Sequence, residues 1–456
     1  MIPSSFRDPH GFVFRRGSVL YRQVNDAHRP HFDRFIESGL YERLVADGLL
    51  VAHKDADVSL AAAPDAYRIL QPEPIAFISY PYEWSFQMLR DAALETLTIQ
   101  TLALDYGMSL RDATAYNVTY HRGRPIFLDT TSFEILPEGR PWIAYRQFCQ
   151  HFLAPLALMS LCDVRLGQLS RLYIDGLPLD LVSRLLPSRA RTKLGLMMHL
   201  RMHSKSQRRH EDKEVPASSL TGSFSKNAFR GVIRSLEKTI QRLAPPQSTS
   251  VWSEYYAEAD HYSVAALQGK ESLVADWIAE VAPRSVWDLG ANTGRFARIA
   301  SRRGIDTVAF DVDPLCVDQA YQDSRAKGDR HFLPLVQDLT NPSTGIGWGA
   351  KERASLEDRG PADLVLALAL IHHLAIADNV PIPSMLDLLS RLGRWAVVEF
   401  VPKSDPKVRL LLRNREDVFP DYRTEAFEIA AEARFRIEKR EPVADSGRTL
   451  YLLGPR

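Results

Sequence analysis

A glycine-rich turn in the second half of this 456-residue chain constrains its fold more than any other feature. The turn follows an apolar strand and opens a helix, and it reads Val286-Trp287-Asp288-Leu289-Gly290-Ala291-Asn292-Thr293-Gly294. About 20 residues later a second apolar strand ends at Asp311. Gly290 permits a sharp turn off the first strand, and Gly294 permits the helix to approach that strand closely. An α/β sheet holds an adenosine-containing cofactor in this way.

The part of the chain around this turn alternates between helices and short apolar strands. Seven strands are expected: 286–289, 307–310, 333–336, 364–368, 395–400, 435–439 and 449–453. Strands that alternate with helices predict a Rossmann-like, mostly parallel sheet with helices on both faces. The last two strands read as a closing pair, so we expect one antiparallel edge strand.

The length predicts two or three domains, because a single core seldom grows beyond about 250–300 residues. Residues 201–250 are polar and charged and contain prolines, which is typical of a linker. The predicted organisation is therefore an α+β domain over 1–200, a linker over 201–250 and an α/β domain over 251–456.

The composition is that of an ordinary soluble protein, with 45% hydrophobic residues, 25% charged residues and a formal net charge of +1. This balance gives no overall attraction to nucleic acid or membranes. The three cysteines are widely spaced, which argues against a zinc site or a disulfide framework. We find neither a secretory signal nor a transmembrane run, and we therefore expect a cytoplasmic protein.

Three carboxylates end the first three strands of the C-terminal half. Asp311 closes the second strand, where a carboxylate can accept hydrogen bonds from both hydroxyls of a ribose. Asp338 closes the third strand, within reach of an adenine amino group. Asp288 can accept donors from a ligand or brace the turn. With Gly290 and Gly294, these residues are the predicted cofactor-binding set.

Asn292 helps to distinguish between adenosine cofactors. A dinucleotide fold places a glycine at this position so that the diphosphate can approach the backbone. The asparagine side chain fills that space, although asparagine tolerates a left-handed backbone. Asp288 would also repel a diphosphate. The same features suit S-adenosylmethionine, whose amino group and sulfonium are cationic, and Asn292 joins the predicted binding set.

Two adjacent histidines, His372 and His373, follow the fourth strand, at the sheet edge that substrates approach. Either could act as a general base toward a hydroxyl or amine. Alternatively, one packs beneath the site and the other caps a helix. Glu399 closes the fifth strand and is either a further acid of the site or a loop anchor.

Taken together, these motifs resemble class I S-adenosylmethionine-dependent methyltransferases. The resemblance covers residues 252–456 and includes Asp363-Leu-Val-Leu-Ala-Leu-Ala-Leu-Ile-His-His-Leu374. It implies methyl transfer from S-adenosylmethionine. The chain lacks a motif that amino-directed methyltransferases of DNA or protein often carry. DNA and protein amino groups are therefore less favoured as substrates.

A second set of polar residues lies in the first half. Asp112 and Asn117 are five residues apart, and a hairpin then leads to a strand that ends at Asp129. This layout resembles the C-lobe of protein and small-molecule kinases. The resemblance implies Asp112 as a base, Asn117 and Asp129 as magnesium ligands, and Mg-ATP as a second cofactor. The chain departs from it in lacking a Gly-rich nucleotide loop and the usual strand lysine, a role that Arg22 or Lys54 would have to fill.

The whole arrangement, with Leu110-Arg-Asp-Ala-Thr-Ala-Tyr-Asn117 ahead of the glycine turn, is similar to the bacterial nodulation-protein-like (NoeA-type) methyltransferases. The resemblance implies methyl transfer to an acceptor that the sequence does not identify, with a glycan, lipid or small metabolite favoured. An ATP- and magnesium-dependent phosphotransferase and a non-catalytic scaffold are the alternative functions.

Overall fold

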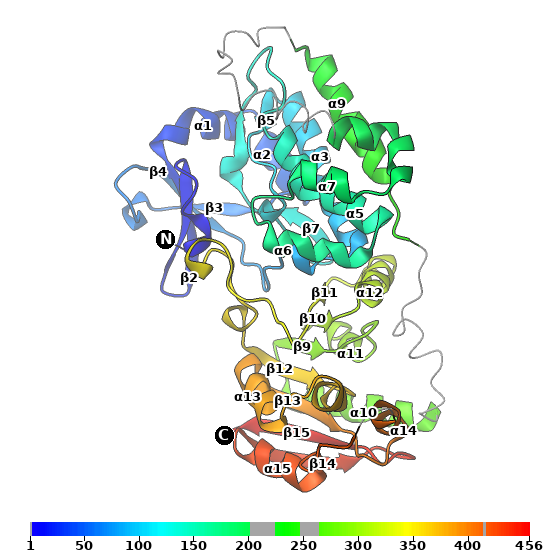
Figure 1. Cartoon of the computed structure of the whole chain (residues 1–456). Coiled ribbons are helices and arrows are strands. Elements are labelled where there is room, and N and C mark those ends of the chain that lie inside the picture. Colours follow the sequence, from blue (N-terminus) through cyan, green and yellow to red (C-terminus); the bar gives the residue numbers. More distant parts are fainter. Residues whose placement is uncertain (1, 201–223, 247–263, 414–415) are drawn as a thin grey trace. The chain divides into compact units, whose positions relative to one another are not determined.

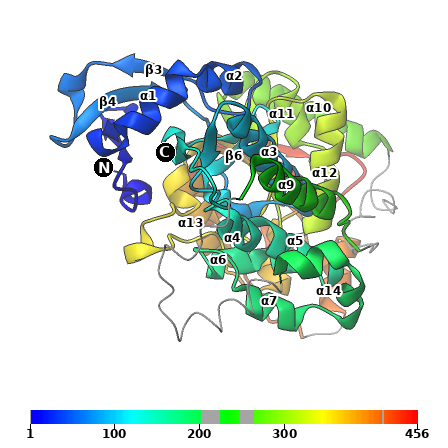
Figure 2. The ribbon, with the colours of Figure 1, turned by 90° about the horizontal axis from the view of Figure 1, so that it is seen from above.

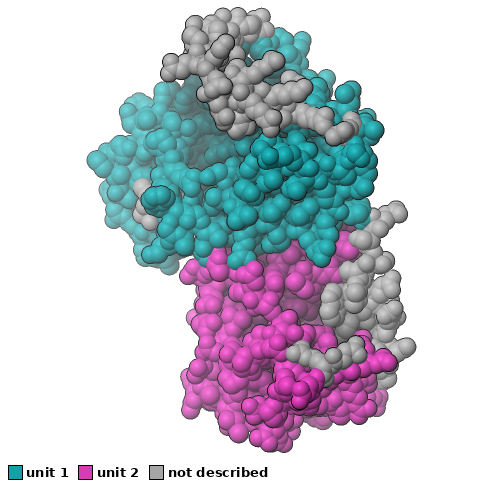
Figure 3. Space-filling model, in the orientation of Figure 1, with its two compact units in different colours: residues 1–247, 345–353 teal, residues 248–344, 354–456 magenta. Residues whose placement is uncertain are grey.

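The computed structural model describes residues 2–200, 224–246, 264–413 and 416–456 (Figure 1). The chain divides into two compact units, coloured separately in Figure 3. Unit 1 comprises residues 1–247 and 345–353, and unit 2 comprises residues 248–344 and 354–456.

Unit 1 begins with a four-stranded antiparallel sheet in the order β1-β2-β4-β3. Its first two strands form a hairpin around Gly17. The strands are β1 (Gly11–Arg16), β2 (Val19–Asn25), β3 (His53–Ala56) and β4 (Ala66–Pro72). Two short helices lie between β2 and β3, α1 (Arg29–Glu37) and α2 (Leu40–Ala46). Gly39 separates them because it adopts a left-handed φ of +81°.

A long buried helix, α3 (Phe86–Asp105), organises the rest of unit 1. The Ser85 hydroxyl caps it by accepting a hydrogen bond from the Met88 backbone N–H. Two antiparallel strand pairs follow, β5 (Met108–Leu110) with β8 (Phe133–Ile135) and β6 (Val118–His121) with β7 (Arg124–Phe127). The next helices are α4 (Tyr145–Phe148), α5 (Ala154–Leu161), α6 (Leu169–Leu172) and α7 (Leu179–Leu185). The pair β6–β7 forms the hairpin that was predicted between Asn117 and Asp129.

Two segments of unit 1 differ from the predicted domain boundaries. Part of the predicted linker is helix α9 (Lys226–Gln241), which lies beside α3 and buries Phe229, Ile233 and Leu236 (Figures 1 and 2). The remainder of that linker, residues 201–223 and 247–250, lies outside the described residues. Residues 345–353 fall inside the predicted C-terminal domain but belong to unit 1. There Glu352 pairs with Arg7 at 2.8 Å.

Unit 2 is built on a seven-stranded mixed sheet in the order β11-β10-β9-β12-β13-β15-β14. The strands are β9 (Ser285–Leu289), β10 (Asp306–Asp311), β11 (Phe332–Val336), β12 (Ala362–Ala367), β13 (Gly393–Phe400), β14 (Phe435–Pro442) and β15 (Thr449–Pro455). The helices are α10 (Val264–Val281), α11 (Ala297–Ser301), α12 (Pro314–Lys327), α13 (Ile382–Leu392), α14 (Pro406–Leu412) and α15 (Thr424–Glu432). The predicted α/β class and the seven strands are confirmed.

The position of the reversed strand corrects the prediction. We expected the antiparallel strand at the edge of the sheet. The reversed strand is β15, which pairs antiparallel with both β13 and β14 and therefore lies inside the sheet. The edges are β11 and β14. Residues 450–454 of β15 are buried, and two neighbouring strands satisfy their backbone hydrogen bonds better than one.

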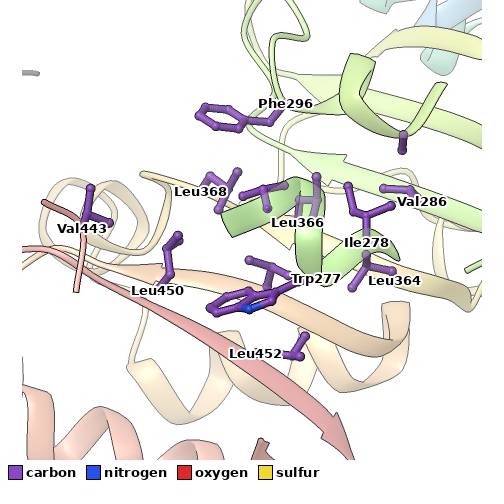
Figure 4. Packing of buried hydrophobic residues seen from close by; sticks show 13 residues of the cluster. Trp277, Ile278, Val286, Phe296, Leu364, Leu366, Leu368, Val443, Leu450 and Leu452 are labelled. Carbon is purple, nitrogen blue, oxygen red and sulfur yellow. The ribbon is translucent and has the colours of Figure 1, made fainter. Parts of the chain in front are cut away.

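The core of unit 2 follows from the alternation of side chains along its strands. Leu364, Leu366 and Leu368 lie two residues apart and therefore face one side of the sheet. They join a fully buried cluster with Trp277 and Ile278 of α10 (Figure 4). Packing helix α10 against this face fixes the central strands from which the glycine turn departs.

Two glycine substitutions test how closely the glycine turn packs against Phe332 of β11. Gly294 has a φ of +82°, and a Cβ atom there would overlap the ring of Phe332. Gly304 is a matched control, because its φ is +77° but a Cβ atom there would meet nothing within 4 Å. We expect Gly304→Ala to lower the free energy of unfolding by about 1–2 kcal/mol through backbone strain alone. Gly294→Ala should cost about 1–3 kcal/mol more because of the overlap. Urea unfolding measures both, and equal losses would contradict the packing role of Gly294.

Candidate functional site

A cavity of about 370 Å³ lies in unit 2, where four neighbouring strands end. These strands are β11, β10, β9 and β12, and the chain order reverses between β9 and β12. Ligands of open α/β sheets bind at such a switch point, outside the carboxyl ends of the strands. The cavity is lined by Gly290, Asn292, Asp311, Val312, Gln337, Asp338, Leu339, Thr340, Leu368, Ala369, Leu370, His373, Leu374, Ala377 and Asp378.

The glycine turn forms one wall of this cavity. Gly290 has a φ of +75°, and its backbone N–H donates to the Phe310 carbonyl at 2.9 Å. Asn292 also has a left-handed φ, +52°, which asparagine adopts at lower cost than most residues. The Asn292 backbone N–H donates to Oδ2 of Asp311 at 2.6 Å. The turn after the first strand is therefore tied to the end of the second.

Asp311 lies where these contacts converge. Its Oδ1 accepts a hydrogen bond from the Asp313 backbone N–H at 2.9 Å, in addition to the Asn292 bond on Oδ2. Burial raises the pKa of Asp311 to about 6, although these hydrogen bonds oppose the shift. Each carboxylate oxygen has a second lone pair. Asp311 can therefore accept two further hydrogen bonds from a ligand in the cavity.

Asp338 follows the end of the next strand and is partly buried. Its Oδ1 accepts hydrogen bonds from the Thr340 backbone N–H at 2.8 Å and from the Thr340 hydroxyl at 2.7 Å. Asp378, which also lines the cavity, has a raised pKa because of burial and the nearby charge of Asp338. Sequence reasoning missed Asp378, which follows an apolar segment without a motif of its own.

Two members of the predicted binding set do not line the cavity. Asp288 is buried, and its Oδ2 accepts a hydrogen bond from the Ala297 backbone N–H at 3.1 Å. It thus braces the first residue of α11, and burial raises its pKa to about 7. Gly294 provides the close contact with Phe332. Their direct contact with a cofactor stays a prediction.

The two histidines occupy different places. His373 lines the cavity, and burial lowers its pKa to about 4. His372 is fully buried, and neither of its ring nitrogens has a hydrogen-bond partner among the described residues. The two ring centroids are 4.1 Å apart. Both rings are therefore neutral near pH 7, and of the two only His373 lines the cavity.

In unit 1 the structure brings two of the three predicted residues, Asn117 and Asp129, together at one side chain. The hydroxyl of Ser132 accepts a hydrogen bond from Nδ2 of Asn117 at 3.0 Å and donates to Oδ2 of Asp129 at 2.6 Å. Oδ1 of Asp129 pairs with Arg22 at 2.5 Å. Burial raises the pKa of Asp112, and the charge of Asp129 adds to this shift. Arg22 thus forms an ion pair with the carboxylate that would have to bind a magnesium ion.

In residues 2–200, 224–246, 264–413 and 416–456, no group of three or more His, Cys, Asp or Glu side chains could hold a metal ion. Across the same ranges, no helix has both the length and the apolar character needed to cross a membrane.

The structure is that of an α/β protein with a cavity at the switch point of its seven-stranded sheet. No model of a protein family matches the sequence. The chain is 37% identical to nodulation protein NoeA of Rhizobium meliloti (strain 1021) over 456 residues, which cover 99% of this chain and 95% of that protein. The chain therefore belongs to the NoeA family.

Several solved structures show a weaker likeness. The bifunctional kinase-methyltransferase WbdD aligns at 16% identity with a TM-score of 0.31, and the match covers 44% of this chain and 41% of WbdD. A TehB-like SAM-dependent methyltransferase from Corynebacterium glutamicum aligns at 19% identity with a TM-score of 0.28, covering 45% of this chain and 98% of its own. Magnesium protoporphyrin IX methyltransferase from Synechocystis, with bound SAH, has a TM-score of 0.31 at 16% identity and covers 44% and 92%.

The raised pKa of Asp288 predicts a pH dependence of stability. Because its folded-state pKa of about 7 exceeds its ordinary value of 3.8, the folded state binds the proton more tightly. The free energy of unfolding should therefore fall as pH rises from about 4 to 7. Asn at this position can still accept the Ala297 hydrogen bond but does not titrate. Between pH 5 and 7, wild type should lose about 2 kcal/mol more than Asp288→Asn. Urea unfolding of both proteins at pH 5 and pH 7 measures these losses of stability. Identical losses in wild type and Asp288→Asn would contradict the raised pKa of Asp288.

Proposed function

We propose that unit 2 binds S-adenosylmethionine and transfers its methyl group to an acceptor. One observation carries this proposal: Asp311 and Asp338 end adjacent strands and line one cavity with the Gly290 turn. Asp311 would accept the ribose hydroxyls, and Asp338 would accept the adenine amino group. Asn292 would lie beside the methionine part of the cofactor.

The charge of the cavity supports a cationic cofactor over a dinucleotide. The lining residues include three carboxylates, those of Asp311, Asp338 and Asp378, and neither a lysine nor an arginine is among them. Such a surface repels a diphosphate and attracts a sulfonium and an ammonium group. The volume of about 370 Å³ falls within the range of small-molecule sites.

The residues around the cavity favour catalysis by placement. S-adenosylmethionine supplies an activated methyl group on its sulfonium. The neutral ring of His373 can accept a proton from an acceptor, but its pKa of about 4 makes it a weak base. Holding the acceptor in line with the methyl group would therefore provide most of the acceleration. We propose a glycan, lipid or small metabolite as the acceptor.

Calorimetric titration with S-adenosylhomocysteine tests the cofactor assignment. Wild type should bind, and Asp311→Ala should bind at least about tenfold more weakly, because two hydrogen bonds to a charged acceptor are lost. Asp313→Ala is the matched control. The Asp313 side chain caps α12 by accepting the Leu315 N–H, and it does not line the cavity. Equal affinities of wild type and Asp311→Ala would overturn the role of Asp311.

Gly290→Val offers a second test. A valine there must adopt a left-handed φ, and its Cβ would lie 3.2 Å from Cδ1 of Leu370. We expect this variant to lose measurable binding of S-adenosylhomocysteine while it stays folded by circular dichroism. A folded variant with wild-type affinity would contradict the position of the cofactor at the turn. Mass spectrometry of cell extract incubated with labelled S-adenosylmethionine would then identify the acceptor.

A second candidate function is phosphotransfer from Mg-ATP in unit 1. The observation in its favour is the meeting of Asn117 and Asp129 at the Ser132 hydroxyl. Asp112 would be the base, and Asn117 and Asp129 would hold magnesium once Arg22 released Asp129. Magnesium-dependent ATP binding that disappears in Asp129→Ala would support this function. Absence of such binding in wild type would exclude it.

A further inference from the structure

Unit 2 contains a network of four charged side chains that are almost fully buried. Lys270 donates to Oε2 of Glu399 at 2.5 Å, and Arg448 lies 3.5 Å from Oε1 of the same carboxylate. Arg448 also pairs with Asp405 at 2.7 Å. Each of the four residues is less than one-tenth exposed. Two positive charges balance two negative charges in the interior.

Such a network is a poor source of stability. Removing two charges from water costs several kcal/mol per ion, and apolar side chains of similar volume often serve as well. The network is better explained by what it holds in place. Oε2 of Glu399 accepts a second hydrogen bond, from the Ala369 backbone N–H at 2.7 Å.

Ala369 is a residue in a strained conformation. Its φ is +50°, a left-handed value that is unfavourable for an alanine. Such a conformation persists only where its surroundings impose it, and such residues cluster at ligand sites. Ala369 lines the cavity between Leu368 and Leu370. The Glu399 carboxylate supplies the contact that fixes its backbone.

The conformation of Ala369 determines where Leu370 lies. The Leu370 side chain packs over the glycine turn, with Cδ1 at 3.2 Å from the position that a Cβ atom on Gly290 would take. The segment that follows β12 thus contacts the glycine turn that follows β9, at the switch point of the sheet. A shift at Ala369 would move Leu370 and change the shape of the cavity.

Lys270 connects the same network to the other side of the turn. Its ammonium lies 4.5 Å from the centroid of the Phe296 ring, which directly precedes α11. Its charge also acts on Asp288, the residue that braces Ala297. The network therefore contacts both segments that frame the cavity.

We propose that Glu399 is a positioning residue for the cofactor, because its carboxylate, held by Lys270 and Arg448, fixes Ala369 in its left-handed conformation and so places Leu370 against the glycine turn. The proposal rests on the proposed binding of S-adenosylmethionine in this cavity. Glu399 is not among the lining residues and acts through the Ala369 backbone.

Paired variants separate the hydrogen bond to Ala369 from the buried charges. Lys270→Met/Glu399→Gln removes both charges of one ion pair and keeps an acceptor for the Ala369 N–H. Lys270→Met/Glu399→Leu removes the charges and the acceptor. Titration with S-adenosylhomocysteine should give at least about tenfold weaker binding for the leucine variant than for the glutamine variant. Equal affinities of these two variants would overturn the proposal.

Substitution of Ala369 provides a readout that a purely structural role would not move. Glycine adopts positive φ values without strain, so it depends less on the Glu399 anchor. Adding Ala369→Gly to Lys270→Met/Glu399→Leu should restore at least about threefold of the lost affinity. No recovery of affinity would count against the role of the backbone conformation.

Two controls keep the test decisive. Neutralising the exposed pair of Arg391 and Glu357, which are 3.0 Å apart in the same unit, should leave affinity at the wild-type level. If the leucine variant does not fold, Glu399→Asp replaces it, because the shorter side chain keeps the charge but withdraws the acceptor. Asp at this position should weaken binding about tenfold, and wild-type affinity would overturn the proposal. Failure of wild type to bind S-adenosylhomocysteine would instead contradict the proposed function itself.

Discussion

The architecture of the cavity depends on one carboxylate that collects backbone N–H groups from two strand ends. Asp311 accepts hydrogen bonds from Asn292 after the first strand and from Asp313 after its own strand. The turn contains three left-handed residues, Gly290, Asn292 and Gly294, and Asp311 is the partner of the Asn292 N–H within it. Asp311 thus organises the turn, and the lone pairs that remain can still bind a ligand.

The burial of its acids gives this arrangement an energetic cost. Burial raises the pKa values of both Asp288 and Asp311, to about 7 and about 6. Carboxylates kept partly protonated by their surroundings are unfavourable for folding near neutral pH and are typical of functional sites. Glu399 and Asp405 are also buried, and each of them forms an ion pair.

Much of unit 2 could be predicted from the sequence because its signals are local. The alternation of apolar strands with helices gave all seven strands, and Asp311 and Asp338 line the cavity because each ends a parallel strand. The position of β15 could not be predicted, since strand order depends on contacts between distant segments. The sequence left two roles open for Asp288 and Glu399, a contact with a ligand or a structural brace. Side-chain direction decides between such roles, and in the structure Asp288 braces Ala297 and Glu399 accepts the Ala369 N–H. In unit 1, the pairing of Arg22 with Asp129 joins residues far apart in the chain.

The interior position of β15 has a consequence for how the protein assembles. Within the described sheet, β14 pairs with β15 alone, and β15 joins it to β13. The five strands from β11 to β13 can form a parallel platform by themselves, but its β13 side stays open until the closing hairpin arrives. β15 is the strand of that pair that contacts β13. Glu399 lies on β13 opposite Leu450, so the closing pair covers the strand that carries the anchor of the cavity wall.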